Sequence, residues 1–355
     1  MTFYTEIGTA RPVPVFVIGA GGIVNTAHLP AYRAAGFDVQ GIFDIDRDKA
    51  ATTAEKFAIP FVFNDLEEMA GKRPPAVVFD VAVPGSEILP VLEQLPAGAA
   101  VLIQKPMGED LAAARKILEL TRQKEMIAGM NFQLRYAPAV MAVRDMIAGG
   151  ELGELYDIEI NINVYTPWQL WDFLYTSPRV EILYHSIHYI DLVRSFLGNP
   201  EGVYAKTTQH PAMKELASVR STIIMDYGPM IRANILTNHC HPYGPGCEQA
   251  SVKFEGSRGA AKIGLGVLKN YPAGEPDTFE YTVMQNGNYT GWKQKEMAGN
   301  WFPDAFAGSM MQVMLAAQGA IDRPDNSVED CIHTMACVEA AYRSDAAGGI
   351  RPDSL

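Results

Sequence analysis

Three glycines near the start of the chain have the spacing of a phosphate-binding turn. Gly19, Gly21 and Gly22 follow the apolar run Val15–Ile18 and precede a helical pattern. Glycine permits a tight turn and lets the backbone approach a diphosphate, which then lies at a helix N-terminus. Val24 replaces the usual small residue, so we expect slightly wider packing of helix on strand. The turn indicates a dinucleotide site, although alone it is a weak motif.

A carboxylate strengthens this interpretation. Asp44 stands at the end of the next apolar run, Val39–Phe43. An acidic group at this point accepts hydrogen bonds from the adenosine ribose and repels a 2′-phosphate. Ile45 follows, so no cation is at hand for that phosphate. The two residues predict NAD as the cofactor, with NADP as the less favoured alternative.

A lysine ends another apolar run. Lys105 follows Ala100–Ile103 and Gln104, and it precedes Pro106, which favours an extended conformation of Lys105. A partly desolvated lysine beside a substrate hydroxyl can lower the pKa of that hydroxyl. An ordinary surface lysine at a strand end is the alternative, and spacing alone does not separate the two.

Four polar residues recur at helical spacing in the segment 179–198. Glu181, Tyr184, His185 and His188 occupy positions i, i+3, i+4 and i+7 and should share one helix face. Histidine has its pKa nearest working pH, so it is the natural general base. Such a face suits proton transfer and sugar binding. A polar helix face with satisfied histidines is the alternative that the residues alone favour.

Aromatic residues are concentrated just before this helix. They could form a pocket wall that stacks on a sugar ring or a nicotinamide, or they could pack in the core. The residues are Tyr165, Trp168, Trp171, Phe173 and Tyr175.

The elements that must position these residues fall into two groups. Up to about residue 130, short apolar runs alternate with longer helical patterns, which predicts βαβ units and a parallel sheet. From about Glu154, closely spaced β-rich runs separated by turns predict a largely antiparallel sheet, and two helical patterns end the chain. We therefore expect an α/β dinucleotide-binding domain over 1–130 and an α+β domain over 131–355.

Composition narrows the function further. The net charge of −12 makes nucleic acid an improbable partner, and no apolar run is long enough to span a membrane. Residues 1–12 contain no apolar segment typical of a signal peptide. The four cysteines lack CxxC spacing, so we expect free thiols in a reducing cytoplasm. The run His239-Cys240-His241 has no second ligand pair nearby, so no metal site is predicted.

Taken together, these residues carry a family pattern. The chain resembles the glucose–fructose oxidoreductase/inositol dehydrogenase/MocA family over nearly its whole length. No single matching piece would suffice, but the order and spacing of so many pieces make the resemblance specific. They are Gly19–Ile23 followed by His28-Leu29-Pro30, Asp44 with Asp46, Pro84, Lys105-Pro106, Asn131–Pro138, Gly150–Glu154 and His188–Leu192.

The resemblance implies a Rossmann domain, a second domain with an open sheet that mediates a homo-dimer or homo-tetramer, and hydride transfer between a sugar or polyol carbon and nicotinamide. It places the family's lysine on Lys105 and its late histidine on His188, with Tyr184 as a further catalytic position. The predicted cofactor-binding residues are Gly19, Gly21, Gly22, Ile23, Asp44, Ile45, Pro84, Lys105 and Trp168. The predicted substrate-binding residues are Lys105, Arg135, Trp168, Trp171, Glu181, His185 and His188.

Two departures from the family pattern keep the chemistry open. Gln104 replaces the usual Glu, which should make Lys105 easier to deprotonate. Tyr184 replaces a frequent Asp, and it cannot act as a second carboxylate at neutral pH. We expect an NAD-dependent dehydrogenase acting on an aldose or polyol, such as the pentoses xylose or apiose. The alternatives are a lyase- or hydrolase-like enzyme that reduces NAD only transiently, and a non-catalytic nucleotide sensor.

Overall fold

The computed structural model describes residues 13–270 and 274–350 of the 355-residue chain. The segment 1–12, on which the signal-peptide expectation rests, lies outside the described residues. The chain divides into two compact units, one formed by 1–137 with 302–335 and the other by 138–301 with 336–355.

The first unit is built on a parallel sheet of six strands in the order β3-β2-β1-β4-β5-β6. This is the strand order of the doubly wound dinucleotide-binding fold. Buried β-branched and aromatic residues fill the strands, as expected for a sheet covered on both faces. The strands are β1 (Val15–Ile18), β2 (Val39–Phe43), β3 (Phe61–Val62), β4 (Val78–Val81), β5 (Ala100–Ile103) and β6 (Ile127–Met130).

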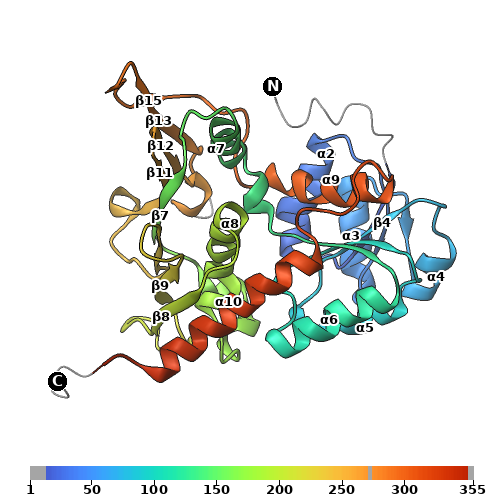
Figure 1. Ribbon diagram of the computed structural model, residues 1–355. Helices are drawn as coiled ribbons and strands as arrows, with labels where there is room; N and C mark the ends of the chain where they lie inside the picture. Colours follow the sequence, from blue (N-terminus) through green and yellow to red (C-terminus); the bar gives the residue numbers. More distant parts are fainter. Residues whose placement is uncertain (1–12, 271–273, 351–355) are drawn as a thin grey trace. The chain divides into compact units, whose positions relative to one another are not determined.

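Helices cover both faces of this sheet (Figure 1). A single apolar cluster joins α2, α3 and α9 to one face, and α5 packs with α6 on the other. The helix α9 comes from the end of the chain, so the returning segment 302–335 completes this core. The helices are α2 (Leu29–Ala34), α3 (Arg47–Phe57), α4 (Leu66–Gly71), α5 (Ile88–Gln94), α6 (Leu111–Gln123) and α9 (Ala305–Ala317).

The second unit is a nine-stranded mixed sheet. Its order is β14-β13-β12-β11-β7-β10-β9-β8, with β15 paired to β13, and among these described strands only the β7–β10 pair is parallel. The predicted fold class, a Rossmann domain followed by an α+β domain with a mostly antiparallel sheet, is thus confirmed. The strands are β7 (Leu155–Asn163), β8 (Gly202–Thr208), β9 (Arg220–Asp226), β10 (Arg232–Asn238), β11 (Gln249–Gly256), β12 (Gly259–Gly264), β13 (Thr278–Gln285), β14 (Asn288–Tyr289) and β15 (Lys293–Gln294).

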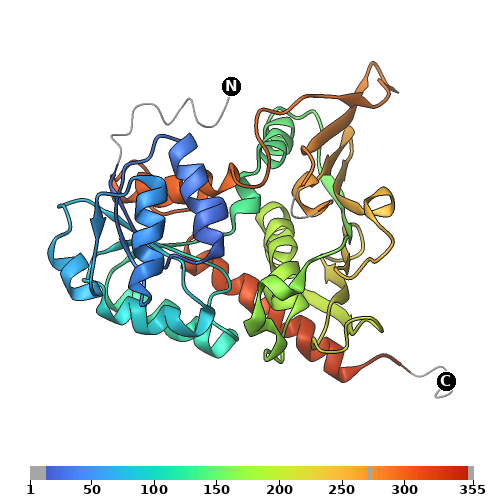
Figure 2. The same cartoon turned by 180° about the vertical axis from the view of Figure 1, so that it is seen from behind.

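One face of this sheet is covered by α7 (Pro138–Ala148), α8 (Ile187–Leu197) and the end of α10 (Val328–Ala347), as the rear view also shows (Figure 2). Burial alternates along β9 and β10, so that Ile223 and Ile235 point to the helices. Ile224, on the opposite face, remains 47 % exposed.

None of the helices in the described ranges is long and apolar enough to cross a membrane. The four cysteines, all of which lie in those ranges, form no disulfide with one another.

Candidate active site

The glycine turn after β1 has the geometry that a bound diphosphate requires. Gly19 has φ +105°, and a Cβ there would lie 2.4 Å from the carbonyl oxygen of Ala82. Only glycine therefore fits at this position. In contrast, a Cβ built on Gly21 or Gly22 would meet no atom within 4 Å, so the backbone faces open space. The helix that follows begins with a π-helical turn at Val24–His28.

Asp44 is fixed to this turn by backbone donors. Its Oδ2 accepts the N–H of Ala20 at 2.7 Å, and its Oδ1 accepts the N–H of Asp46 at 2.8 Å. Each carboxylate oxygen keeps a lone pair for a ribose hydroxyl. The adjacent Ile45 is 96 % exposed, which leaves an apolar surface for an adenine ring. These residues fit a dinucleotide without a 2′-phosphate.

Lys105 follows β5 and is partly buried. Burial lowers the pKa of its ammonium group to about 8, because a desolvated ammonium is less stable than a hydrated one. The lysine is still mostly charged at neutral pH, and it can exchange a proton near working pH. The peptide N–H of Lys105 donates to Oε1 of Gln104 at 2.8 Å.

Three predicted residues meet at one edge of the parallel sheet. Gly19 follows β1, the exposed Pro84 follows β4, and Lys105 follows β5. Because β1, β4 and β5 are parallel neighbours about 4.8 Å apart, the ends of β1 and β5 are about 10 Å apart. Ligands of open parallel sheets bind outside this edge. The glycine turn and Lys105 therefore lie at the same ligand-binding edge of the first unit's sheet.

In the second unit, the predicted polar face lies on a helix that starts irregularly. A π-helical turn, Ile182–Ser186, precedes α8. This wider turn, a feature often found at functional sites, changes the expected spacing of the side chains. His188 lies in the first turn of α8 and is 7 % exposed. The edge of its ring meets the indole of Trp301, with the centroids 5.7 Å apart.

Glu181 is fully buried and belongs to a polar cluster inside the second unit. Its Oε1 accepts a hydrogen bond from the Ser186 hydroxyl at 2.7 Å and lies 3.8 Å from Nε2 of His239. Burial raises the pKa of Glu181 and lowers the pKa of His239 to about 3. His239 is therefore neutral at physiological pH. Its Nδ1 is 3.0 Å from the hydroxyl of Thr166.

His185 connects this cluster to the aromatic segment. Its ring lies over that of His239, with centroids 4.4 Å apart and planes tilted by 31°. Trp168, which is fully buried, meets His185 edge-on at 4.8 Å and donates its indole N–H to the carbonyl of His239. Trp171 and Tyr184 pack at the rim of the same apolar cluster. Trp168 and Glu181 thus lie inside the unit, while Tyr184 and His185 keep partial access to solvent.

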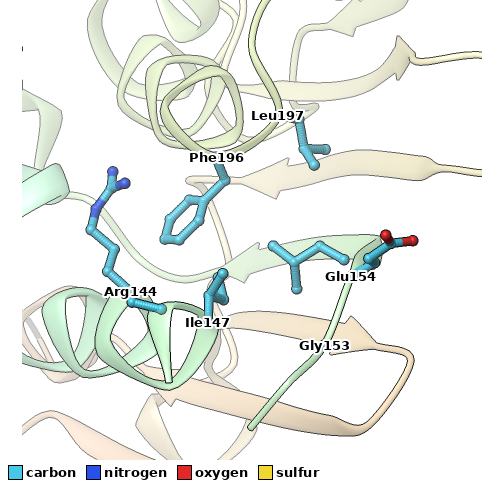
Figure 3. Close-up of a pocket in the computed structure, with 8 residues that line it drawn as sticks. Arg144, Ile147, Gly153, Glu154, Phe196 and Leu197 are labelled. Carbon is cyan, nitrogen blue, oxygen red and sulfur yellow. The ribbon is translucent and has the colours of Figure 1, made fainter. Parts of the chain in front are cut away.

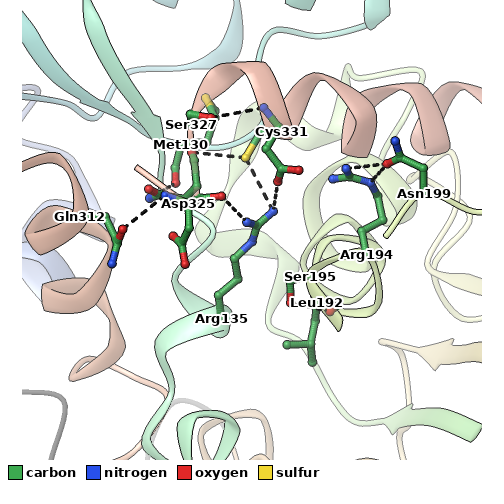
Figure 4. A network of polar contacts seen from close by, with 12 residues as sticks. Met130, Arg135, Leu192, Arg194, Ser195, Asn199, Gln312, Asp325, Ser327 and Cys331 are labelled. Atoms are coloured by element: carbon green, nitrogen blue, oxygen red, sulfur yellow. Dashed lines mark hydrogen bonds and ion pairs between the residues drawn. The ribbon is translucent and has the colours of Figure 1, made fainter. Parts of the chain in front are cut away.

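Arg135 is buried and holds the returning segment of the first unit (Figure 4). Its guanidinium donates to the carbonyl of Asp325 at 2.8 Å and to the carboxylate of Asp330 at 2.6 Å. The charge-assisted bond to Asp330, together with the bond to the Asp325 carbonyl, fixes the geometry of the segment. In the second unit, the same figure shows Arg194 donating to the side chain of Asn199.

The second unit also has a surface hollow of about 530 Å³ (Figure 3). The guanidinium of Arg144 lies 4.3 Å from the ring centre of Phe196 there and donates to the hydroxyl of Ser195. The hollow contains none of the predicted catalytic or substrate-binding residues. Its lining is Arg144, Ile147, Ala148, Gly153, Glu154, Leu155, Phe196 and Leu197.

The strand order, the glycine turn and Asp44 define the class of proteins with a dinucleotide-binding Rossmann domain. Comparison with known families agrees with this class. Residues 13–132 match the oxidoreductase family with an NAD-binding Rossmann fold, and residues 140–262 match the GFO/IDH/MocA C-terminal domain. The chain belongs to the GFO/IDH/MocA oxidoreductase family, and NAD is the cofactor of its first domain.

Individual relatives are distant. The chain is 33 % identical to the YceM oxidoreductase of Salmonella typhimurium over 129 residues, which are 36 % of this chain and 41 % of that protein. It is 24 % identical to 1,5-anhydro-D-fructose reductase of Ensifer adhaerens, over 73 % of this chain and 77 % of the reductase. An oxidoreductase from Agrobacterium radiobacter, crystallised with NAD⁺, L-tartaric acid and magnesium, has the same fold. Its TM-score is 0.78 at 18 % identity, covering 96 % of this chain and 98 % of that one.

Proposed function

We propose that this protein is an NAD-dependent dehydrogenase that oxidises a hydroxyl-bearing carbon of a sugar or polyol. The observation that carries the proposal is the position of Lys105. Lys105 follows β5, and the glycine turn follows β1 at the same edge of the sheet. Burial lowers the pKa of the Lys105 ammonium to about 8. A proton-exchanging cation and a dinucleotide turn on one sheet edge suit hydride transfer from an alcohol.

The chain supplies the proton chemistry. Lys105 donates a hydrogen bond to the substrate oxygen and stabilises the negative charge that develops on it. His188 takes the hydroxyl proton as general base. Tyr184 supplies a further hydrogen bond to the substrate. NAD, when bound, would supply the acceptor for the hydride of the substrate carbon.

We propose a sugar as the substrate partly because the Ensifer adhaerens relative is named for a reaction on 1,5-anhydro-D-fructose. Our specific choice of substrate is an aldose that is oxidised at its anomeric carbon, and among aldoses a pentose such as xylose or apiose. Arg135, Trp168, Trp171, Glu181 and His185 remain the proposed substrate-binding or pocket-shaping residues. The buried positions of Glu181 and Trp168 favour an indirect role for both. Trp168 contacts the ring of His185, and Glu181 lies beside His239, whose ring stacks on that of His185.

We also propose that the protein is a cytoplasmic homo-oligomer. The sheet face opposite the helices exposes three apolar side chains on adjacent strands, Tyr204, Ile224 and Leu236. A second copy of the chain would cover this face and remove apolar surface from water.

A substrate screen tests the proposal. The full-length protein is incubated with NAD or NADP and a panel of aldoses and polyols, and NADH fluorescence is followed. We expect NADH with at least one sugar, and a fall in kcat of at least about a hundredfold in Lys105→Met and His188→Asn. Near-normal kcat in both variants would refute the assignment, and sugar turnover without NADH would support the lyase-like alternative.

A further inference from the structure

A chain of buried hydrogen bonds lies directly behind Lys105 in the first unit. Nδ1 of His28 is 2.7 Å from Oδ2 of Asp80, and the same oxygen accepts the hydroxyl of Tyr32 at 3.0 Å. Nε2 of His28 is 3.3 Å from Nε2 of Gln104. The other end of that amide, Oε1, accepts the peptide N–H of Lys105 at 2.8 Å. The chain thus runs from a carboxylate through an imidazole and an amide to the lysine backbone.

The amide of Gln104 has only one orientation that satisfies both neighbours. A peptide N–H can only donate, so the atom of Gln104 that faces Lys105 must be the oxygen. The NH₂ group then faces His28 and donates to its Nε2. An imidazole nitrogen that accepts carries no proton, so His28 holds its single proton on Nδ1 and donates it to Asp80. A second amide, Nδ2 of Asn131, lies 3.2 Å from the same Nε2 and agrees with this tautomer.

The surroundings of His28 leave this tautomer well defined. His28, Asp80, Asn131 and Tyr32 are all fully buried. On the remaining side the ring packs against Phe306 of α9, with centroids 5.0 Å apart. Among the contacts of the His28 ring in the described part of the chain, Asp80 is the carboxylate and Tyr32 the other titratable group.

We infer that Asp80, His28 and Gln104 form a positioning relay for Lys105, in which Gln104 acts as the neutral amide that couples the His28 ring to the lysine backbone. The catalytic part of this inference rests on the proposed function of Lys105. The hydrogen-bond chain itself does not, because its protonation state can be measured without a substrate.

A carboxylate in place of the Gln104 amide would reverse the donor and acceptor roles at Nε2 of His28. Glutamate can accept from the Lys105 N–H, but it cannot donate to Nε2 of His28 when ionised. His28 would then take up a second proton and lie as a cation between Asp80 and the new carboxylate. The new negative charge adjacent to Lys105 would stabilise the ammonium. Gln104 therefore donates to Nε2 of His28, where an ionised glutamate could only accept from it.

The first test reads the protonation of His28 directly. In ¹⁵N-labelled full-length protein at neutral pH, we expect His28 to show a protonated Nδ1 and an unprotonated Nε2. Gln104→Glu, which is isosteric, should show both nitrogens protonated, and the exposed amide substitution Gln94→Glu should leave His28 unchanged. A wild-type His28 protonated on Nε2, or a Gln104→Glu spectrum identical to wild type, would overturn the relay. The wild-type spectrum decides the tautomer even if the variant fails to fold.

The second test reads Lys105 without using activity. Labelling of the Lys105 amine by an amine-reactive reagent is measured against pH by mass spectrometry. We expect half-maximal labelling near pH 8 in wild type, a shift of about half a pH unit upward in Gln104→Glu, and no shift in Gln94→Glu. An unshifted Gln104→Glu curve would show that the amide does not act on Lys105. If the wild-type protein shows the expected His28 spectrum but turns over no sugar, the proposed function fails and the hydrogen-bond relay stands.

Discussion

The side chain of Gln104 accepts the peptide N–H of Lys105 through Oε1 at 2.8 Å, so the residue before the lysine turns back onto the lysine's own backbone. The sequence predicts easier deprotonation of Lys105 because glutamine replaces glutamate. The pKa of Lys105 is indeed lowered, to about 8, and burial is the cause. In the relay that we infer, Gln104 orients the lysine backbone through Oε1 and donates through its amide to Nε2 of His28.

The glycine turn can be dissected with two alanines. Gly19→Ala should destabilise the protein by more than about 1 kcal/mol, because φ is +105° and the new Cβ would collide with the Ala82 carbonyl. Gly21→Ala should leave the melting temperature unchanged, because its Cβ would enter open space. We propose that the diphosphate binds in that space, so we expect about a tenfold rise in the Kd for NAD by calorimetry. Unchanged NAD affinity in folded Gly21→Ala would contradict this placement.

Cofactor choice should depend on Asp44. Asp44→Ala removes the charged acceptor for the ribose hydroxyls, which is worth about 1.5–3 kcal/mol. We therefore expect the preference for NAD over NADP, measured as a ratio of Kd values, to fall about ten- to a hundredfold. Asp44→Asn removes the charge but keeps an acceptor for one of the two backbone N–H groups, so it is compared with Asp44→Ala, which keeps neither. Asp48→Ala, a neighbouring carboxylate in α3, serves as the control, and an equal change there would count against Asp44.

The buried His239 should make the protein less stable in acid. Folded His239 has a pKa of about 3, whereas an unfolded histidine has a pKa of about 6.5. The unfolded chain therefore binds this proton first, and stability falls as the pH drops below 6.5, by about 1.4 kcal/mol per pH unit.

Denaturant unfolding at pH 6.5 and pH 5 measures this slope. His239→Gln should lose about 1.5 kcal/mol less than wild type over the interval. The exposed His333→Gln controls for the loss of a histidine as such. If wild type and His239→Gln lose the same free energy of unfolding over this interval, folded His239 takes up its proton as readily as the unfolded chain does, which would contradict the prediction.

The open sheet face should mediate self-association. Ile224→Lys places an ammonium in the centre of this face, and burying it unpaired in an interface would be costly. We expect at least about a tenfold weaker association by light scattering across a dilution series. Met230→Lys, at an exposed turn between β9 and β10, should leave the oligomer intact. A monomeric wild type, or an unaffected Ile224→Lys, would rule out this interface.

Much of the first unit could be predicted because its signals are local. Apolar runs ending in Gly19, Asp44 and Lys105 gave the strands, the sheet edge and the cofactor. The return of 302–335 to the first unit could not be predicted, because nothing in the sequence of α9 indicates which of the two sheets the helix packs on. The two-residue β3 was also missed, since it is too short to show a period.

The second half of the site was less predictable. Helical spacing placed Glu181 beside His188 on an accessible face, but the π-helical turn at Ile182–Ser186 alters that spacing, and Glu181 is buried. His239 directly follows β10, so its contact with His185 depends on tertiary packing. His28 was visible as part of the family pattern, yet its link to Lys105 required the positions of Asp80 and Gln104.

Isotope transfer tests the central claim most directly. A sugar substrate carrying deuterium on the oxidised carbon is turned over with NAD, and the cofactor and product are analysed by mass spectrometry. We expect the deuterium in NADH, released in proportion to oxidised sugar, with a rate at least about a hundredfold lower in Lys105→Met and His188→Asn. Deuterium retained in the sugar product with no labelled NADH released, or transfer at an unchanged rate in both variants, would contradict the account.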